Sequence, residues 1–257
     1  MYRLAGGHSG AVVFSALGDS LIVKLGEKDA LHRHEHLKLS ATHYRMNYPR
    51  SFLLSDKISI YQHCGPTIFD SVVKGDYSTL RAYNQIIEGI GTPTISKLAS
   101  ISASQKLRSI LATGKMPFDL QVKIELLLKK WPSQLTVLGW GPSHNDLTLT
   151  NILFNGLDFT LIDPASSYLN NFSVDTAKIR QELVYGWSYI LAGKEHLFDP
   201  TNRYFLEIVN AIKLDDCDYF DLINVCRIIP YATSGKIKQR LVTWANEIST
   251  RIHSSQR

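Results

Sequence analysis

The chain has 257 residues, of which 44% are hydrophobic and 20% are charged, so it can bury a core of ordinary globular size. No apolar run reaches membrane-spanning length, and the start of the chain lacks a signal-peptide core, so we expect a soluble cytoplasmic protein with no membrane partner. The net charge of +5 fits an anionic ligand, but no interleaving of aromatic and basic residues indicates nucleic acid.

The N-terminal part of the chain is predicted to be rich in β-strands. Three short β-prone runs, AVVFSALG, SLIVKLG and KISIYQHC, are separated by glycine and polar residues. Between the second and third runs lies KDALHRHEHLKLSATH, for which we expect a helix. The first lobe is therefore expected to be a small sheet with one helix.

After Gly65 and Pro66 the hydrophobic pattern becomes helical. Apolar residues recur at helical spacing over residues 80–90 and 120–131, and helices are also expected over residues 176–191 and 237–252. The sequence thus predicts an α+β chain with a small β-rich lobe, a hinge near residues 61–68 and a larger helical lobe.

The stretch SHNDLTLTNILFNGLDFTLIDPA places acids and amides among apolar β-formers. Residues 155–158 (NGLD) are typical of a hairpin loop. Paired positions in such a hairpin have numbers that sum to about 314, so we expect Asn151 beside Asp163 at its open end. Asp146 lies five residues before Asn151, close enough to curl back to the same place.

This convergence indicates a particular chemistry. A neighbouring amide and carboxylate offer oxygen ligands that suit Mg²⁺ bound to phosphates. A further carboxylate that does not bind the metal can accept the proton of a hydroxyl group. Together these are the parts needed for phosphoryl transfer. The alternative, acids and amides that only cap backbone groups in turns, does not predict three side chains at one point.

The same stretch resembles the catalytic core of the protein-kinase-like superfamily, especially its aminoglycoside phosphotransferase and choline kinase branch. The family pattern H-x-D-x-x-x-x-N is present as His144, Asp146 and Asn151, and the acid after the next strand is Asp163. The resemblance implies that Asp146 is the catalytic base, that Asn151 and Asp163 hold Mg²⁺, and that His144 supports the loop by hydrogen bonding. Asp175 matches an acid that braces this loop.

The resemblance also implies a bilobal fold in which residues 1–64 bind the nucleotide and residues 65–257 provide catalysis and acceptor binding. Lys24, in the strand LIVKLG, matches the phosphate-binding lysine of the family. Glu35 in the following helix is its candidate partner, and Glu27 is the alternative. Gly6, Gly7 and Gly10 are candidates for a phosphate-binding turn. Gln62 and Cys64 are candidate hinge residues, whose backbone would contact adenine.

The sequence after Asp163 indicates the kind of phosphate acceptor. Asp-Pro replaces the D-F-G of protein kinases and no A-P-E follows, so a peptide-docking segment has no room. We therefore expect ATP and Mg²⁺ as cofactors and a small hydroxylated acceptor, such as a sugar, an amino alcohol or an aminoglycoside-like molecule. Two alternatives stay open, a compact toxin-type protein kinase and a catalytically silent binding module with a kinase fold.

Overall fold

The structure of the chain, a computed structural model, describes residues 2–4, 12–17, 20–26, 29–55, 57–90, 95–138, 141–165, 171–212, 216–232 and 234–255. The chain forms two compact units. The first comprises Met1–Ile90 and His144–Ser166, and the second comprises Gly91–Ser143 and Ser167–Arg257. This partition differs from the expected division at residues 64 and 65, because residues 65–90 and the hairpin stretch both belong to the first unit, where the hairpin strands contact the helices at residues 30–43 and 68–72. The expected division of functions, with nucleotide binding in residues 1–64 and catalysis and acceptor binding in residues 65–257, stays a prediction.

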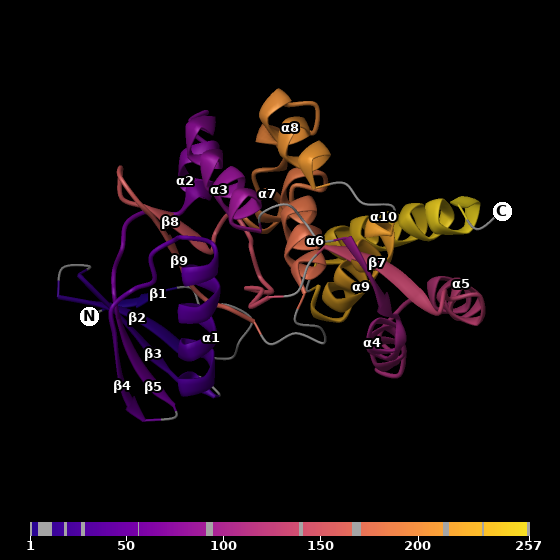
Figure 1. Cartoon of the computed structure of the whole chain (residues 1–257), viewed down its shortest axis with the longest axis horizontal. Coiled ribbons are helices and arrows are strands. Elements are labelled where there is room, and N and C mark those ends of the chain that lie inside the picture. Colours follow the sequence, from indigo (N-terminus) through magenta and orange to yellow (C-terminus); the bar gives the residue numbers. More distant parts are fainter. Residues whose placement is uncertain are drawn as a thin grey trace. The chain divides into compact units, whose positions relative to one another are not determined.

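The first unit is built on an antiparallel sheet with the strand order β1-β2-β3-β5-β4 (Figure 1). The three strands expected from the sequence are present, and two more, at the edges of the sheet, were not predicted. The strands are β1 (Tyr2–Leu4), β2 (Val12–Ala16), β3 (Leu21–Leu25), β4 (Ser51–Ser55) and β5 (Ile58–Gln62).

Helix α1 (Ala30–His43) connects β3 to β4, as predicted. Its buried side chains lie at positions i, i+7, i+10 and i+11, which gives the helix one face toward the core: Ala30, Leu37, Ser40 and Ala41. Beyond its end, Asn47 donates to the carbonyl of Phe159 and accepts from the N–H of Leu161, both at 2.9 Å. The segment after α1 is therefore bonded to a strand more than a hundred residues further along the chain.

The connection after β5 is tied to the hairpin stretch. Gly65 has φ 106°, and a Cβ at this position would lie 2.8 Å from the carbonyl oxygen of Phe154. The N–H of Phe154 donates to Pro66 at 2.8 Å. A side chain at residue 65 would separate these segments, so glycine permits their close approach. The rest of the first unit comprises α2 (Ile68–Val72), the 3₁₀ turn η1 (Tyr77–Leu80), α3 (Arg81–Ile90), β8 (Ile152–Phe154) and β9 (Phe159–Leu161).

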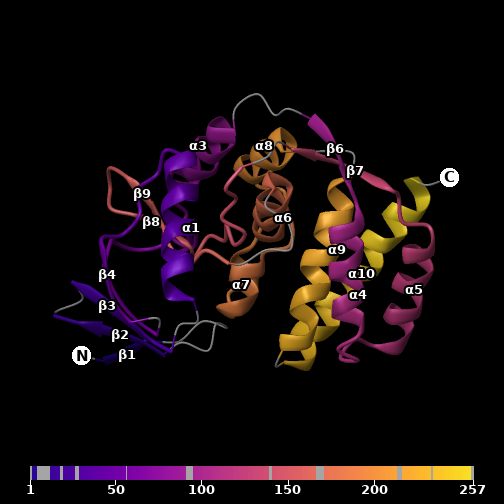
Figure 2. The ribbon, with the colours of Figure 1, turned by 60° about the horizontal axis from the view of Figure 1, so that its bottom comes forward.

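The second unit is mostly helical, and its central helix α9 packs against α4, α6 and α10 (Figure 2). Two strands, β6 (Ile95–Ala99) and β7 (Gln134–Leu138), pair antiparallel. The helices are α4 (Ile101–Leu111), α5 (Phe118–Lys129), α6 (Phe172–Leu183), α7 (Trp187–Leu191), α8 (Arg203–Ala211), α9 (Cys217–Ile228) and α10 (Gly235–Ser255), with 3₁₀ turns η2 (Glu195–Leu197) and η3 (Ile229–Tyr231).

The predicted helices over residues 80–90, 120–131 and 237–252 are confirmed as α3, α5 and α10, with small shifts at their ends. The helix predicted over residues 176–191 is wrong in one respect, because it is two helices. Gly186 interrupts it with φ 64°, a left-handed conformation that a continuous helix cannot contain. Among the described residues, no helix combines the length and the apolar character needed to cross a membrane.

Candidate active site in the first unit

The hairpin predicted around residues 155–158 is confirmed. Strands β8 and β9 pair antiparallel, and the Asn155 side chain accepts hydrogen bonds from the N–H groups of Leu157 and Asp158, at 3.0 and 2.8 Å. This arrangement closes the loop locally, as asparagine commonly does in turns. Gly156 has φ 96°, so the loop also uses the freedom of a glycine.

The register of the hairpin differs from the expected one by a single residue. Leu153 pairs with Thr160, so Asn151 lies opposite Ile162, and the N–H of Ile162 donates to the Asn151 carbonyl at 3.0 Å. Asp163 follows one position later with φ 57°, outside the regular strand conformation. The open end of the hairpin is therefore where the sequence placed it, but Asp163 leaves the ladder instead of pairing directly with Asn151.

Asp146 and Asn151 are in direct contact, as the predicted curl of the chain requires. The Asn151 amide nitrogen Nδ2 donates to the backbone oxygen of Asp146 at 2.9 Å and to its carboxylate oxygen Oδ2 at 3.0 Å. Both bonds use Nδ2, which leaves the amide oxygen Oδ1 for a cation. Between His144 and Asp146, Asn145 has φ 67°. Like Asp163, it is a non-glycine residue in the left-handed region.

Lys24 reaches the same site from the sheet. It lies on β3, opposite Val13 and Ser59 on the two neighbouring strands. Its Nζ forms an ion pair with the Asp163 carboxylate. The Lys24 side chain is 13% exposed and that of Asp163 is 39% exposed, so the carboxylate can be reached from solvent. The sheet and the hairpin together thus bring a cation and a carboxylate to one point.

Helix α1 presents an arginine to this site. Nη2 of Arg33 donates to the backbone carbonyl of Pro164 at 2.8 Å. Glu35 is exposed and has no ion pair with the described residues, so it does not pair with Lys24 there. Two residues along a helix turn the side chain by about 200°, which places Glu35 away from the face of Arg33. Glu27, the alternative, lies outside the described residues.

Sequence reasoning missed Arg33, although a signal was present. Arg33 is three residues after Ala30 and four before Leu37, both of which are buried. This spacing places Arg33 on the core-facing side of α1, whereas Glu35 was proposed from the family resemblance without regard to the helix face.

His144 is fully buried beside this loop. Burial lowers its pKa to about 4, while the Asp146 carboxylate and the Ile162 backbone act in the opposite direction. His36 and Arg33 also lower the pKa. The imidazole is therefore neutral at neutral pH. The His144 backbone carbonyl accepts from the N–H of Ala165 at 3.1 Å, which connects the loop to the residues after β9.

The hinge candidates follow β5. The N–H of Gln62 donates to Arg50 at 2.8 Å, and the Cys64 thiol donates to the Gln62 carbonyl at 3.4 Å. The backbone N–H and C=O of Cys64 form no hydrogen bond with any residue that the structure describes, so they are available to a ligand. Adenine binding by this segment stays a prediction.

The remaining predicted site residues are not part of the described constellation. The glycine-rich turn, with Gly6, Gly7 and Gly10, lies outside the described residues. Asp175 is buried in the first turn of α6, in the second unit. Its bracing of the catalytic loop therefore stays a prediction.

The donor set suits Mg²⁺. This ion takes oxygen ligands, keeps several waters and is commonly held by one or two carboxylates together with substrate phosphates. The amide oxygen of Asn151 and the partly exposed Asp163 carboxylate provide oxygens of this kind. Within the described ranges, no three or more His, Cys, Asp and Glu side chains form a cluster that could hold a metal by themselves.

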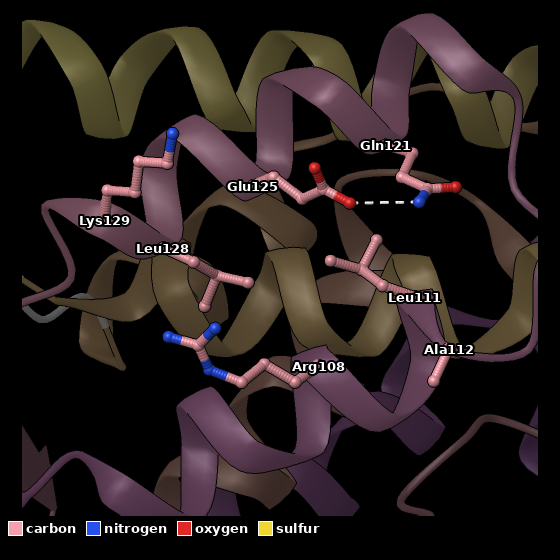
Figure 3. A pocket seen from close by; sticks show the side chains of 7 residues that line it. All are labelled: Arg108, Leu111, Ala112, Gln121, Glu125, Leu128 and Lys129. Carbon is pink, nitrogen blue, oxygen red and sulfur yellow. Dashed lines mark hydrogen bonds between the residues drawn. The ribbon is translucent and has the colours of Figure 1, made fainter.

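A cavity of about 460 Å³ lies elsewhere, between α4 and α5 of the second unit (Figure 3). Its walls include the apolar side chains of Leu111 and Leu128, and Gln121 donates to Glu125 at 3.0 Å beside it. It contains none of the residues that the sequence marks as functional. The constellation around Asp163 is therefore the candidate active site.

The sequence matches no known protein family and no curated protein. Solved structures do match. The chain is similar to a thermostable mutant of aminoglycoside phosphotransferase APH(4)-Ia (TM-score 0.58, 12% identity, covering 99% of this chain and 94% of that chain). It is also similar to a choline/ethanolamine kinase family protein from Mesorhizobium loti (0.53, 12%, 98% and 86%) and to ADP-bound aminoglycoside phosphotransferase APH(2'')-Ib (0.50, 14%, 96% and 91%).

At these low identities the similarity concerns the fold. The small antiparallel sheet, the helix after its third strand and the later helices match over nearly the whole chain. The chain has the protein-kinase-like fold of the aminoglycoside phosphotransferases and choline/ethanolamine kinases, and the fold predicted from the sequence is confirmed.

Proposed function

We propose that this protein transfers the γ-phosphate of Mg-ATP to a hydroxyl group of a small molecule, such as a sugar, an amino alcohol or an aminoglycoside-like compound. The observation that carries the proposal is the contact of Asn151 with Asp146 next to the ion pair of Lys24 with Asp163, all in one compact unit. A base, two oxygen donors and a phosphate-binding cation are the parts of a phosphoryl-transfer site.

Asp146 is the proposed catalytic base. The Asn151 amide holds both its backbone and its carboxylate, so the orientation of the acid is fixed before an acceptor arrives. The carboxylate, held in this orientation, is the group that receives the acceptor's proton. A base within hydrogen-bond reach of a hydroxyl group commonly accelerates transfer by about 10²–10⁴-fold.

Asn151 and Asp163 are the proposed ligands of Mg²⁺, which would neutralise charge on the phosphate oxygens. The ion pair of Lys24 with Asp163 supports this assignment, because it places the ammonium next to the carboxylate that would hold the metal. Upon nucleotide binding, the Lys24 ammonium exchanges this carboxylate for phosphate oxygens. One neighbour in fold is ADP-bound by its own description, which supports a nucleotide as the phosphate donor.

A small acceptor is supported by the shortness of the chain between the two units. Helix α6 begins at Phe172, so only residues 164–171 separate it from Asp163. The neighbours in fold are a choline/ethanolamine kinase family protein and two aminoglycoside phosphotransferases, whose names refer to small molecules. An ATP-dependent reaction and three cysteines that form no disulfide also fit the reducing cytoplasm, where we place the protein.

Titration of nucleotide with and without Mg²⁺ tests the proposal. We expect ATP to raise the thermal midpoint of the wild-type protein in the presence of Mg²⁺, because a ligand that binds only the folded state stabilises it. Asp163→Asn should lose the Mg²⁺-dependent part of this rise. Asp158→Asn, an exposed acid in the loop of the same hairpin, is the matched control and should behave like wild type.

A panel of acceptors with labelled ATP separates the three functions considered. Labelled sugars, amino alcohols or aminoglycosides support the proposal. Labelling of protein, including the chain itself, would instead indicate a protein kinase. An absence of Mg²⁺-dependent nucleotide binding would contradict the proposal and leave a binding module.

A further inference from the structure

The backbone at Asp163 has a conformation that its sequence does not favour. Its φ of 57° lies in the left-handed region, which costs a non-glycine residue roughly 1–2 kcal/mol. Asp163 also precedes Pro164, and the residue before a proline prefers an extended backbone. Neighbouring groups must therefore hold this residue in place, as is common at functional sites.

Backbone hydrogen bonds hold the residues on both sides of Asp163. The N–H of Ile162 donates to Asn151 at 3.0 Å, and the N–H of Ala165 donates to His144 at 3.1 Å. Pro164 has no N–H, so its carbonyl oxygen is the only backbone group through which it can be hydrogen-bonded. Arg33 donates to this oxygen at 2.8 Å.

The helix that carries Arg33 is held in place by packing and by backbone hydrogen bonds. Helix α1 buries Leu37 and Ala41 on the same face, and the segment after it bonds to β9 through Asn47. The helix that carries Arg33 is therefore connected at its far end to the hairpin that carries Asp163. A guanidinium also stays charged at every physiological pH and offers several donors in a rigid plane.

From these contacts we infer that Arg33 is a positioning residue, which holds the Pro164 carbonyl so that the Asp163 carboxylate faces the metal site. Lys24 and Arg33 then have separate tasks. Lys24 contacts the carboxylate itself and must exchange it for phosphate, whereas the bond of Arg33 to the Pro164 carbonyl leaves the carboxylate untouched and can persist when metal and nucleotide bind. The inference rests on the proposed Mg²⁺-nucleotide function.

The experiment compares Arg33→Met, Arg33→Lys and Lys38→Met, where Lys38 is an exposed cation on the same helix. Bound Mn²⁺, a spectroscopic substitute for Mg²⁺, is counted by electron paramagnetic resonance in the presence of ADP. We expect Arg33→Met to weaken metal binding about tenfold, the scale of one lost charged hydrogen bond, while ADP affinity without metal changes by less than about twofold. Arg33→Lys should recover most of the loss, and Lys38→Met should match wild type.

The possible failures are distinguishable. A wild-type chain that binds no metal with ADP would overturn both the proposed function and this inference. Wild-type metal binding that Arg33→Met leaves unchanged would overturn the inference alone. Equal weakening of ADP with and without metal would assign Arg33 a general structural role and also overturn it. If Arg33→Met does not fold, the comparison of Arg33→Lys with Arg33→Gln decides, with lysine expected to bind metal more tightly.

Discussion

The two compact units both contain pairs of opposite charges, but they bury them to different degrees. In the first unit the carboxylate of Asp163 is 39% exposed next to Lys24. In the second unit Arg180 on α6 meets Asp221 on α9 at 2.8 Å, and these side chains are 10% and 1% exposed. A carboxylate that must exchange its partner for a metal needs access to solvent, whereas one that connects two helices does not.

The second unit extends this buried pairing along the same two helices. The Asn224 amide on α9 donates to the Gln181 side chain on α6 at 2.6 Å. Every residue of α6 is buried, although more than half of them are polar or charged. Such a helix is stable only when its polar groups find partners. The contrast is therefore between polar groups that bond to one another and polar groups that stay accessible to a ligand.

The largest expected effect comes from breaking the buried pair. Arg180→Met leaves the Asp221 carboxylate buried without its cation, which typically costs about 3–5 kcal/mol of the free energy of unfolding. The double variant Arg180→Met/Asp221→Leu should recover most of this loss, because it removes both charges. Urea denaturation of the single and double variants measures the difference.

The matched control for this pair is the exposed one. Lys236 is 81% exposed and lies 3.8 Å from Glu195, so Lys236→Ala should change the free energy of unfolding by less than about 1 kcal/mol. Equal losses for Lys236→Ala and Arg180→Met would show that burial does not separate the two pairs.

In the first unit the corresponding change should affect chemistry instead of stability. Asp146→Asn keeps the size of the side chain but removes the charge of the proposed catalytic base. We expect single-turnover phosphoryl transfer to fall about 10²-fold or more, equivalent to roughly 2.7 kcal/mol of barrier, with nucleotide affinity nearly unchanged. Unchanged transfer would show that Asp146 is not the catalytic base.

The contrast between the units explains which parts of the site the sequence predicts. Asp146, Asn151 and Asp163 are close in the sequence, and local hairpin geometry was sufficient to bring them together. The role of Lys24 in the site came from resemblance to a family, and its contact with Asp163 was not predicted, because residues 139 positions apart share no local pattern. Arg33 was missed because the helix face, rather than the residue type, determined which side chain enters the site.

The sequence was least informative in the second unit. Residues 215–221 (DDCDYFD) include four acids, a density that is typical of an exposed surface segment. Asp216 instead accepts from the N–H of Thr136 at 2.6 Å, Asp218 pairs with Arg251, and Asp221 is buried. Partners on other helices and on strand β7, distant in the chain, determine the environment of these acids, and no local spacing reveals them.

A smaller effect concerns pH, where the two units should respond in opposite directions. The His144 pKa is about 4 in the folded chain and 6.5 in its ordinary range. As the pH falls from 6.5 toward 4, the unfolded chain binds a proton that the folded chain does not. His144 should therefore make the folded state less stable in this window, by roughly 1.4 kcal/mol for each unit by which its pKa is lowered.

Asp221 works with the opposite sign. Burial raises its pKa from 3.8 to about 6, against the effect of Arg180. As the pH rises from 3.8 to 6, the unfolded chain releases a proton that the folded chain keeps, so stability is lost as the pH rises. Denaturation at several pH values should show a weaker loss toward acid in His144→Gln and a stronger one in Asp221→Asn. The reverse pattern would contradict the assignment.

The smallest expected effect compares one glycine from each unit. Gly156 in the hairpin loop has φ 96°, whereas Gly235 at the start of α10 has no left-handed backbone, and an added Cβ meets no atom within 4 Å at either position. An added methyl group therefore meets no steric hindrance at either glycine, and the two positions differ in their backbone conformation. Gly156→Ala should destabilise the chain by about 1 kcal/mol, since alanine is strained there. Gly235→Ala should be neutral or stabilise it by up to about 1 kcal/mol, because alanine restricts the unfolded chain. Thermal denaturation of the two variants measures this difference, and equal shifts would show that the hairpin loop does not depend on its left-handed residue.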